Sequence, residues 1–168
     1  MSNSKEHDRL LEPCKQWLER NYNLVHCEME PHKLGLGSNT LIPDVIGWDT
    51  SGNVYVVDAK VTRADAVAQL QKVADKGSLG RYCWIAEPVG ASMTRPNGWG
   101  VLKVDSDDGV REMLAPETQP QDSQLTQKIL TQCLAKEEAR EHKQRGPHGT
   151  RKAELHEILL TMGGRCEA

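Results

Sequence analysis

Two short apolar runs separated by a turn-rich segment constrain the fold of this chain more than any other feature. Leu41–Trp48 and Val54–Val61 are rich in β-branched residues, which is typical of β-strands. The segment between them, Asp49–Asn53, is made of the polar and glycine residues that form turns. We therefore expect the two runs to pair as an antiparallel β-hairpin.

Charged side chains interrupt both runs. Asp44 follows Pro43 in the first run, and Asp58 and Lys60 lie in the second. A hairpin whose loop is Thr50–Gly52 places Asp44 directly opposite Asp58. Opposed residues have Cβ atoms about 5 Å apart, so the two carboxylates can share one metal ion. A slip of one residue in the register would separate them.

Side-chain alternation assigns the charges of the second run to one face of the hairpin. Asp58 and Lys60 share this face with Val54 and Val56. The opposite face is apolar, and we expect it to pack on a core: Tyr55, Val57, Ala59 and Val61. The alternative is a solvated hairpin with one polar face. A charge inside a strand is costly unless an ion or a partner compensates it, which favours a site.

Pro43-Asp44 followed, after a short hairpin, by Asp58-Ala59-Lys60 resembles the motif of the PD-(D/E)XK nuclease superfamily. The resemblance covers roughly Lys5 to Asp105, as the order helix, three strands, helix, two strands. It implies an α/β, restriction-endonuclease-like core with a central mixed β-sheet flanked by helices. It also implies a metal-dependent endonuclease that hydrolyses phosphodiester bonds, with DNA as the favoured substrate.

The resemblance also implies roles for individual residues. Asp44 and Asp58 would bind one or two Mg²⁺ or Mn²⁺ ions, together with the backbone carbonyl of Ala59. Lys60 would orient the attacking water and stabilise charge in the transition state. Gln69, on the helix expected after the second run, would hydrogen-bond that water or a phosphate. A surface glutamine beside a core leucine is the alternative for Gln69.

An acid from the first helix often completes the metal shell in this family. Four acids lie on the helix predicted over Lys5–Tyr22: Glu6, Asp8, Glu12 and Glu19. Glu6 lies on the flank of the apolar stripe and is our candidate. Glu12 stays open, because Pro13 predicts a kink or a late helix start and makes the helical phase uncertain. A solvated acid is the alternative for each of the four.

The remaining segments supply the other helices and strands that the family resemblance implies. Periodicity predicts a helix that starts at Thr62-Arg63-Ala64-Asp65 and ends near Lys76. It predicts strands at Leu24–Met29, Arg81–Ala86 and Val101–Val104, and a short edge strand at Met113–Leu114.

The 168-residue chain is long enough for one domain with an appendage. We expect a nuclease-like core over 1–115, a linker over 116–124 and a helical C-terminal extension over 125–168. Its two helices, Leu125–Lys143 and Thr150–Met162, would pack on the core or on a partner, and the family resemblance makes a homodimer possible. The basic segment His148–Lys152 has the character of a phosphate contact, with a solvated helix start as the alternative.

Other ligand chemistry is weakly indicated. His26 and His32 fall near the expected site, where each is as compatible with a core or edge position as with a ligand. No His-Cys spacing indicates zinc, and the five cysteines show no C-x-x-C pair. We therefore expect free thiols, a reducing cytoplasm and no membrane partner.

The net charge of -3 argues against strong non-specific affinity for nucleic acid. It leaves two alternatives to the nuclease. One is a catalytically weak or inactive nuclease-fold protein that acts as a nucleic-acid-binding or protein-assembly module. The other is a structural protein of a phage or mobile element whose acids are incidental. The complete set of Asp44, Asp58 and Lys60 favours the enzyme.

Overall fold

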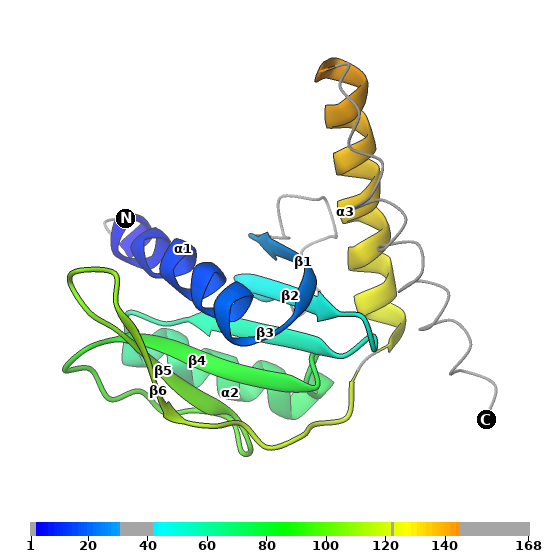
Figure 1. Ribbon diagram of the computed structural model, residues 1–168. Helices are drawn as coiled ribbons and strands as arrows, with labels where there is room; N and C mark the ends of the chain where they lie inside the picture. Colours follow the sequence, from blue (N-terminus) through cyan, green and yellow to red (C-terminus); the bar gives the residue numbers. More distant parts are fainter. Residues whose placement is uncertain (1–2, 31–41, 122, 145–168) are drawn as a thin grey trace.

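The computed structural model describes residues 3–30, 42–121 and 123–144 (Figure 1). Over these ranges the chain forms one six-stranded mixed β-sheet and three helices, an α/β fold. The elements in chain order are α1 (Asn3–Asn21), β1 (Leu24–Met29), β2 (Val45–Asp49), β3 (Val54–Ala59), α2 (Arg63–Lys76), β4 (Tyr82–Pro88), β5 (Gly100–Val104), β6 (Val110–Leu114) and α3 (Ser123–Gln144).

The strands lie in the sheet in the same order as in the chain. β1, β2 and β3 form an antiparallel meander, β3, β4 and β5 are parallel, and β6 returns antiparallel to β5. The parallel step from β3 to β4 requires a crossover, and α2 supplies it. The candidate acids lie where β2 begins and where β3 ends, which is one end of the sheet.

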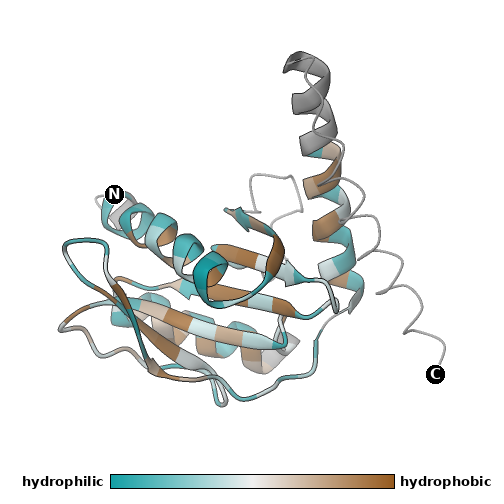
Figure 2. Cartoon of the chain, viewed as in Figure 1, coloured by the Kyte–Doolittle hydropathy of each residue, from teal (hydrophilic) through white to brown (hydrophobic). Residues whose placement is uncertain are grey.

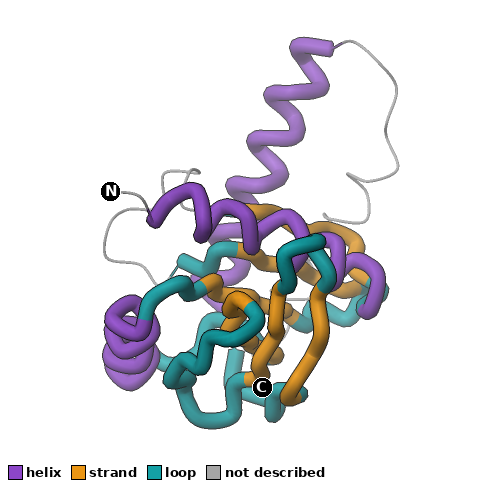
Figure 3. The backbone as a smooth tube through the Cα atoms, turned by 90° about the vertical axis from the view of Figure 1, so that its left-hand side faces the viewer, coloured by secondary structure: helices purple, strands orange, loops and turns teal. Residues whose placement is uncertain are grey.

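Side chains on the two faces of the sheet enter two hydrophobic cores. One core joins α1 to residues such as Val45, Val57 and Trp84. The other joins α2 and α3 to residues such as Ile46 and Val56. Figures 1 and 3 show α1 and α2 on different sides of the strands, and Figure 2 shows apolar residues recurring along the central strands.

Burial on both faces corrects the expectation for the hairpin. We expected one face to carry the charges, but every residue of β3 is buried. The reason is that β3 lies inside the sheet beside the parallel strand β4, and helices cover both faces of such strands. Asp58 is therefore more deeply buried than a hairpin with one polar face would allow.

Most predicted elements are confirmed, with small changes at their ends. β1 has the predicted bounds, and α2 begins after Thr62, whose side chain accepts a hydrogen bond from Asp65 N as an N-cap. The predicted edge strand is longer, since β6 starts at Val110. The late start considered for the first helix is wrong, because α1 begins at Asn3 and Pro13 lies within it.

The C-terminal part is only partly described. Residues 115–121 contain no helix or strand, and α3 follows them in the place of the helix predicted over 125–143. The first half of α3 packs on the sheet through Ile129, Leu130, Cys133 and Leu134, while its second half rises away from the sheet (Figure 3). The helix predicted at 150–162, the basic segment 148–152 and the loop 31–39 lie outside the described residues.

Two further expectations concern the whole chain. The cysteines of the described ranges (Cys14, Cys27, Cys83 and Cys133) are all buried and are not in disulfides. No helix in those ranges combines the length and the apolar character that a bilayer-spanning segment needs.

We expect Leu130→Ala to destabilise the whole domain, because the Leu130 side chain is fully buried in the core between α3 and the sheet. The loss should be about 2–5 kcal/mol in the free energy of unfolding, as for other buried leucines. Lys128→Ala, at an exposed position of the same helix, should change it by less than about 0.5 kcal/mol. Urea denaturation followed by tryptophan fluorescence measures both. An unchanged midpoint for Leu130→Ala would show that α3 is an independent appendage.

Candidate functional site

The predicted register of the hairpin is confirmed. Val45 pairs with Val57 and Ile46 with Val56, and the same register continues to the turn. There Asp49 N donates to Asn53 O over 3.2 Å, and the Asp49 carboxylate accepts the backbone N–H groups of Ser51 and Asn53. One step beyond the first pair, this register brings Asp44 opposite Asp58.

Asp44 lies just before β2, and three groups surround its carboxylate. Its Oδ2 atom accepts a hydrogen bond from Ala59 N at 2.8 Å and lies 3.1 Å from His7 Nε2. Lys60 Nζ is 3.9 Å from the same oxygen. Burial acts to raise the pKa of Asp44, but the hydrogen bonds with His7 and with the Asp58 carboxyl, together with the charge of Lys60, outweigh it and hold that pKa below its usual value.

Asp58, at the end of β3, is the more deeply buried carboxyl, with 5% of its side chain exposed. Its Oδ1 atom lies 2.9 Å from Lys60 Nζ. Its Oδ2 atom has no hydrogen-bond partner among the described residues. Burial and the neighbouring Asp44 carboxylate raise the pKa of Asp58 to about 7, against the opposing charge of Lys60. Near neutral pH, Asp44 is therefore ionised while Asp58 still holds a proton part of the time.

Lys60 and Gln69 line a cavity of about 350 Å³ beside the two acids, together with His7 and Ala59. The backbone N–H of Lys60 donates to Ala86 O of β4, so the sheet fixes the start of its side chain. Gln69 comes from α2 and is 6% exposed. A larger cavity, of about 690 Å³, lies between the end of α2 and residues 119–121, and it contains none of these side chains.

The structure brings the Ala59 N–H to Asp44 and places Gln69 in the cavity that His7 and Lys60 also line, but it does not bring Glu6 there. Glu6 is exposed and lines a different hollow, next to Pro88 and Asp105. Of the other acids of α1, Asp8 is 62% exposed and its Oδ1 atom lies 3.5 Å from His7 Nδ1, so it contacts the site only through His7. Glu12 accepts a hydrogen bond from Gln16, and Glu19 pairs with Lys15. The carbonyl role assigned to Ala59 stays a prediction, since the contact seen is made by its N–H.

His7 is the site residue that the sequence analysis missed. It occupies the position in which an acid of the first helix was expected, and its hydrogen bond to Asp44 raises the pKa of its imidazole despite partial burial. A signal was present, because His7 lies one helical turn before Leu10 and Leu11 and two turns before Cys14. It therefore continues the buried stripe of α1.

The donor set fits a divalent hard cation. Two carboxylates lie side by side, and Oδ2 of Asp58 is buried without a partner, which is a costly arrangement that a cation would relieve. Asp44, Asp58 and the Ala59 carbonyl are the groups that would hold Mg²⁺ or Mn²⁺. His32, the other histidine considered near the site, lies outside the described residues, and His26 belongs to a separate cluster on β1.

Comparison with known proteins supports the fold alone. No family model matches the chain, and no curated protein matches it in sequence. Among solved structures, the chain is similar to the SPO1766 protein of unknown function from Silicibacter pomeroyi, with a TM-score of 0.60 and 19% sequence identity. The match covers 85% of this chain and 93% of that one.

We expect Asp58→Asn to remove a pH dependence of stability. Because the pKa of Asp58 is raised, the folded protein keeps a proton that the unfolded chain releases above about pH 4. Between pH 5 and pH 7 the wild type should therefore lose about 2 kcal/mol more unfolding free energy than Asp58→Asn. Urea denaturation in EDTA measures this difference. Asp107→Asn, at an exposed turn, should keep the wild-type profile. Parallel profiles for wild type and Asp58→Asn would contradict the raised pKa.

Proposed function

We propose that this chain is a metal-dependent nuclease of the PD-(D/E)XK type, with a restriction-endonuclease-like core, that cleaves phosphodiester bonds as an endonuclease, with DNA as its substrate. The observation that carries the proposal is the meeting of Asp44, Asp58 and Lys60 at one end of the β2–β3 hairpin. These are the three residues of the motif, and the register of the hairpin supports their grouping.

The fold is compatible with the proposal. The order of α1, three strands, α2 and two strands agrees with the order that the resemblance implies for residues 5–105. Helices cover both faces of the mixed sheet, and the motif lies at an open end of it, beside a cavity. This compatibility is weaker support than the side-chain geometry, because many α/β enzymes share such a layered sheet.

Each residue near the cavity has a task under this proposal. Asp44 and Asp58 hold the ion, and when bound the ion lowers the pKa of a water ligand and polarises the scissile phosphate. The Lys60 ammonium lies within reach of both carboxylates, where it can orient the water and stabilise negative charge that develops on the phosphate. Gln69 faces the same cavity and offers an amide donor to a phosphate oxygen or to the water.

His7 adds a positioning role. Its imidazole is hydrogen-bonded to Asp44 Oδ2, the oxygen that also accepts Ala59 N–H. These two contacts fix the Asp44 carboxylate in one orientation. A cationic His7 also adds positive charge beside the cavity, which favours an approaching phosphate.

One observation favours the alternative of an inactive binding or assembly module. Lys60 and His7 already compensate the charge of the two carboxylates, so the cluster has internal partners in the absence of an ion. The net charge of -3 also limits the electrostatic attraction of nucleic acid. A cleavage assay with matched variants separates the two functions.

We expect the full-length protein to cleave plasmid DNA in Mg²⁺ or Mn²⁺ and not in EDTA. Asp58→Ala should abolish cleavage and weaken metal binding, because it removes a ligand. Lys60→Ala should lower the turnover by about 10²-fold or more while metal affinity, measured by calorimetry, changes little. Lys15→Ala, which removes one positive charge from the far part of α1, should cleave as the wild type does.

Each outcome bears on a different part of the proposal. Equal cleavage by Lys60→Ala and wild type would refute the role of Lys60. Binding of plasmid, linear or single-stranded DNA without cleavage in either metal would favour the module. A protein that neither binds nor cleaves any of these substrates would exclude both nucleic-acid functions.

A further inference from the structure

A second cluster of metal-ligating side chains lies on β1 and α3, away from the carboxylate pair. His26, Glu28 and Cys133 each offer one ligand atom, and these atoms all lie within 4.8 Å of one another. His26 pairs with Trp48 and Glu28 with Ile46 across the β1–β2 ladder. Side chains of paired residues lie on the same face of a sheet, so His26 and Glu28 point toward the core that contains α3.

Two of the three donors are buried, and Glu28 is partly buried with 15% of its side chain exposed. His26 is 2% exposed and Cys133 is fully buried on the sheet-facing side of α3. The ring of Trp48 packs against the His26 ring with centroids 5.8 Å apart, which restricts rotation of the imidazole. A buried group of imidazole, thiol and carboxylate is chemically unlike the aliphatic side chains around it, such as Ile129 and Leu130.

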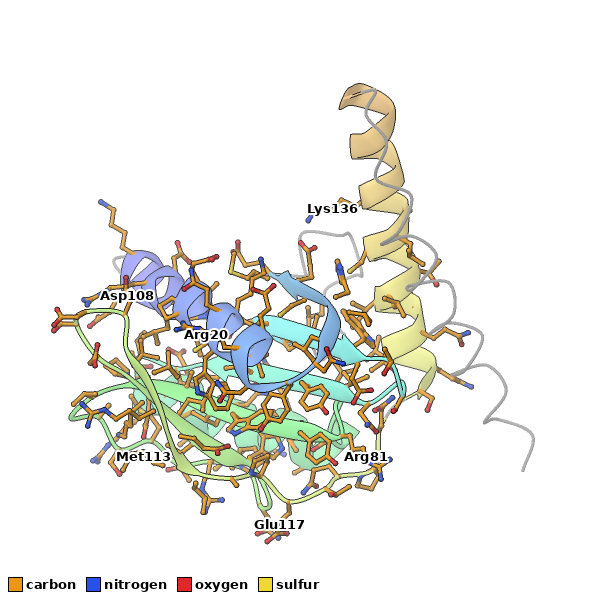
Figure 4. All side chains as sticks on the ribbon, viewed as in Figure 1. Arg20, Arg81, Asp108, Met113, Glu117 and Lys136 are labelled. Carbon is orange, nitrogen blue, oxygen red and sulfur yellow. The ribbon has the colours of Figure 1, made fainter. Side chains whose placement is uncertain are left out.

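Glu28 is held so that one of its oxygens faces the cluster. Its Oε1 atom forms an ion pair with Lys136 Nζ at 2.6 Å, and its Oε2 atom lies 3.7 Å from His26 Nε2. Lys136 extends from α3 toward β1 to make this contact (Figure 4). Such an outer contact orients a ligating carboxylate and leaves its other oxygen to bind a metal.

The donor types select a borderline metal ion. Zinc binds imidazole nitrogen, thiolate sulfur and carboxylate oxygen at about 2.0–2.3 Å, which places tetrahedral ligands about 3.5 Å apart. The three ligand atoms lie within 4.8 Å of one another, so around an ion the widest separation would have to shorten by about 1 Å. Mg²⁺ and Ca²⁺ prefer oxygen donors alone, so the thiol disfavours them.

We propose that His26, Glu28 and Cys133 form a zinc site that ties α3 to the edge strand β1. On binding, the Cys133 thiol releases its proton to solvent, and the thiolate, an imidazole nitrogen and Glu28 Oε2 ligate the ion. Three protein ligands leave the fourth tetrahedral position to water. Residues 115–121, which lead from β6 toward α3, contain no helix or strand, so the effect of the site would be to fix α3 on the sheet.

The test uses the full-length protein, stripped of metal with EDTA and kept reduced. Co²⁺ serves as the spectroscopic probe, because a cobalt–thiolate bond gives a charge-transfer band in the near ultraviolet, and Zn²⁺ should displace it at one ion per chain. Cys133→Ser should lose the band. The matched control is Cys27→Ser. Cys27 is a buried cysteine of β1, the strand that carries His26 and Glu28, but its side chain lies in the opposite core, so this variant should keep the band.

Two more variants protect the test against a folding defect in Cys133→Ser. Glu28→Gln and His26→Gln should each weaken Zn²⁺ binding at least tenfold in calorimetry while circular dichroism stays that of the wild type. Asp58→Asn should bind Zn²⁺ at this site as the wild type does, which separates the site from the carboxylate pair. Zinc should raise the Tm of wild type but not of Cys133→Ser.

The proposal is overturned if the wild type shows no cobalt–thiolate band. It is equally overturned if Cys133→Ser keeps the full band, or if Glu28→Gln and His26→Gln both bind Zn²⁺ with wild-type affinity. In those cases the three side chains form a polar cluster that stabilises the β1–α3 contact without a metal.

Discussion

Backbone pairing between β2 and β3 holds Asp44 and Asp58 together, because they lie one step beyond its last pair, Val45 and Val57. A hydrogen bond from the backbone N–H of Ala59, the last residue of β3, also holds the Asp44 carboxylate next to Asp58. Lys60, two residues beyond Asp58, then lies within reach of both carboxylates. A slip of one residue would turn one carboxylate to the opposite face, so the proposed metal chemistry depends on this register.

Burial gives the two carboxyl groups different electrostatic properties. Asp44 keeps His7 as a hydrogen-bonding partner, and its pKa is lowered. Asp58 lies inside a sheet covered on both faces, and its pKa is raised to about 7. Two chemically identical groups thus differ because their surroundings differ, which is how active sites divide acid and base roles. The desolvation cost of Asp58 is the physical reason to expect a cation there.

The face of the sheet that carries these acids also carries the His26 cluster, and the two groups differ in donor chemistry. The first offers oxygen atoms, and the second adds an imidazole and a thiol. The carboxylate pair would therefore bind a hard cation and the His26 cluster would bind zinc, because their ligand types differ. The second cluster also gives α3 a polar attachment to β1 beside its apolar one through Ile129 and Leu130.

Local patterns were enough to predict the hairpin register and the start of α2 at Thr62, because turns, strand pairs and helix caps depend on residues a few positions apart. His7 was missed although it continues the stripe of Leu10, since its contact with Asp44 exists only once α1 docks on the sheet. The burial of both faces of β3 likewise depends on helices that are distant in the chain.

The sequence by itself therefore determined the elements, their order and the placement of Asp44 opposite Asp58. Only the tertiary structure decided that His7 contacts Asp44, that Gln69 lines the cavity beside Lys60 and that Cys133 meets His26, because these placements depend on how α1, α2 and α3 pack across the sheet.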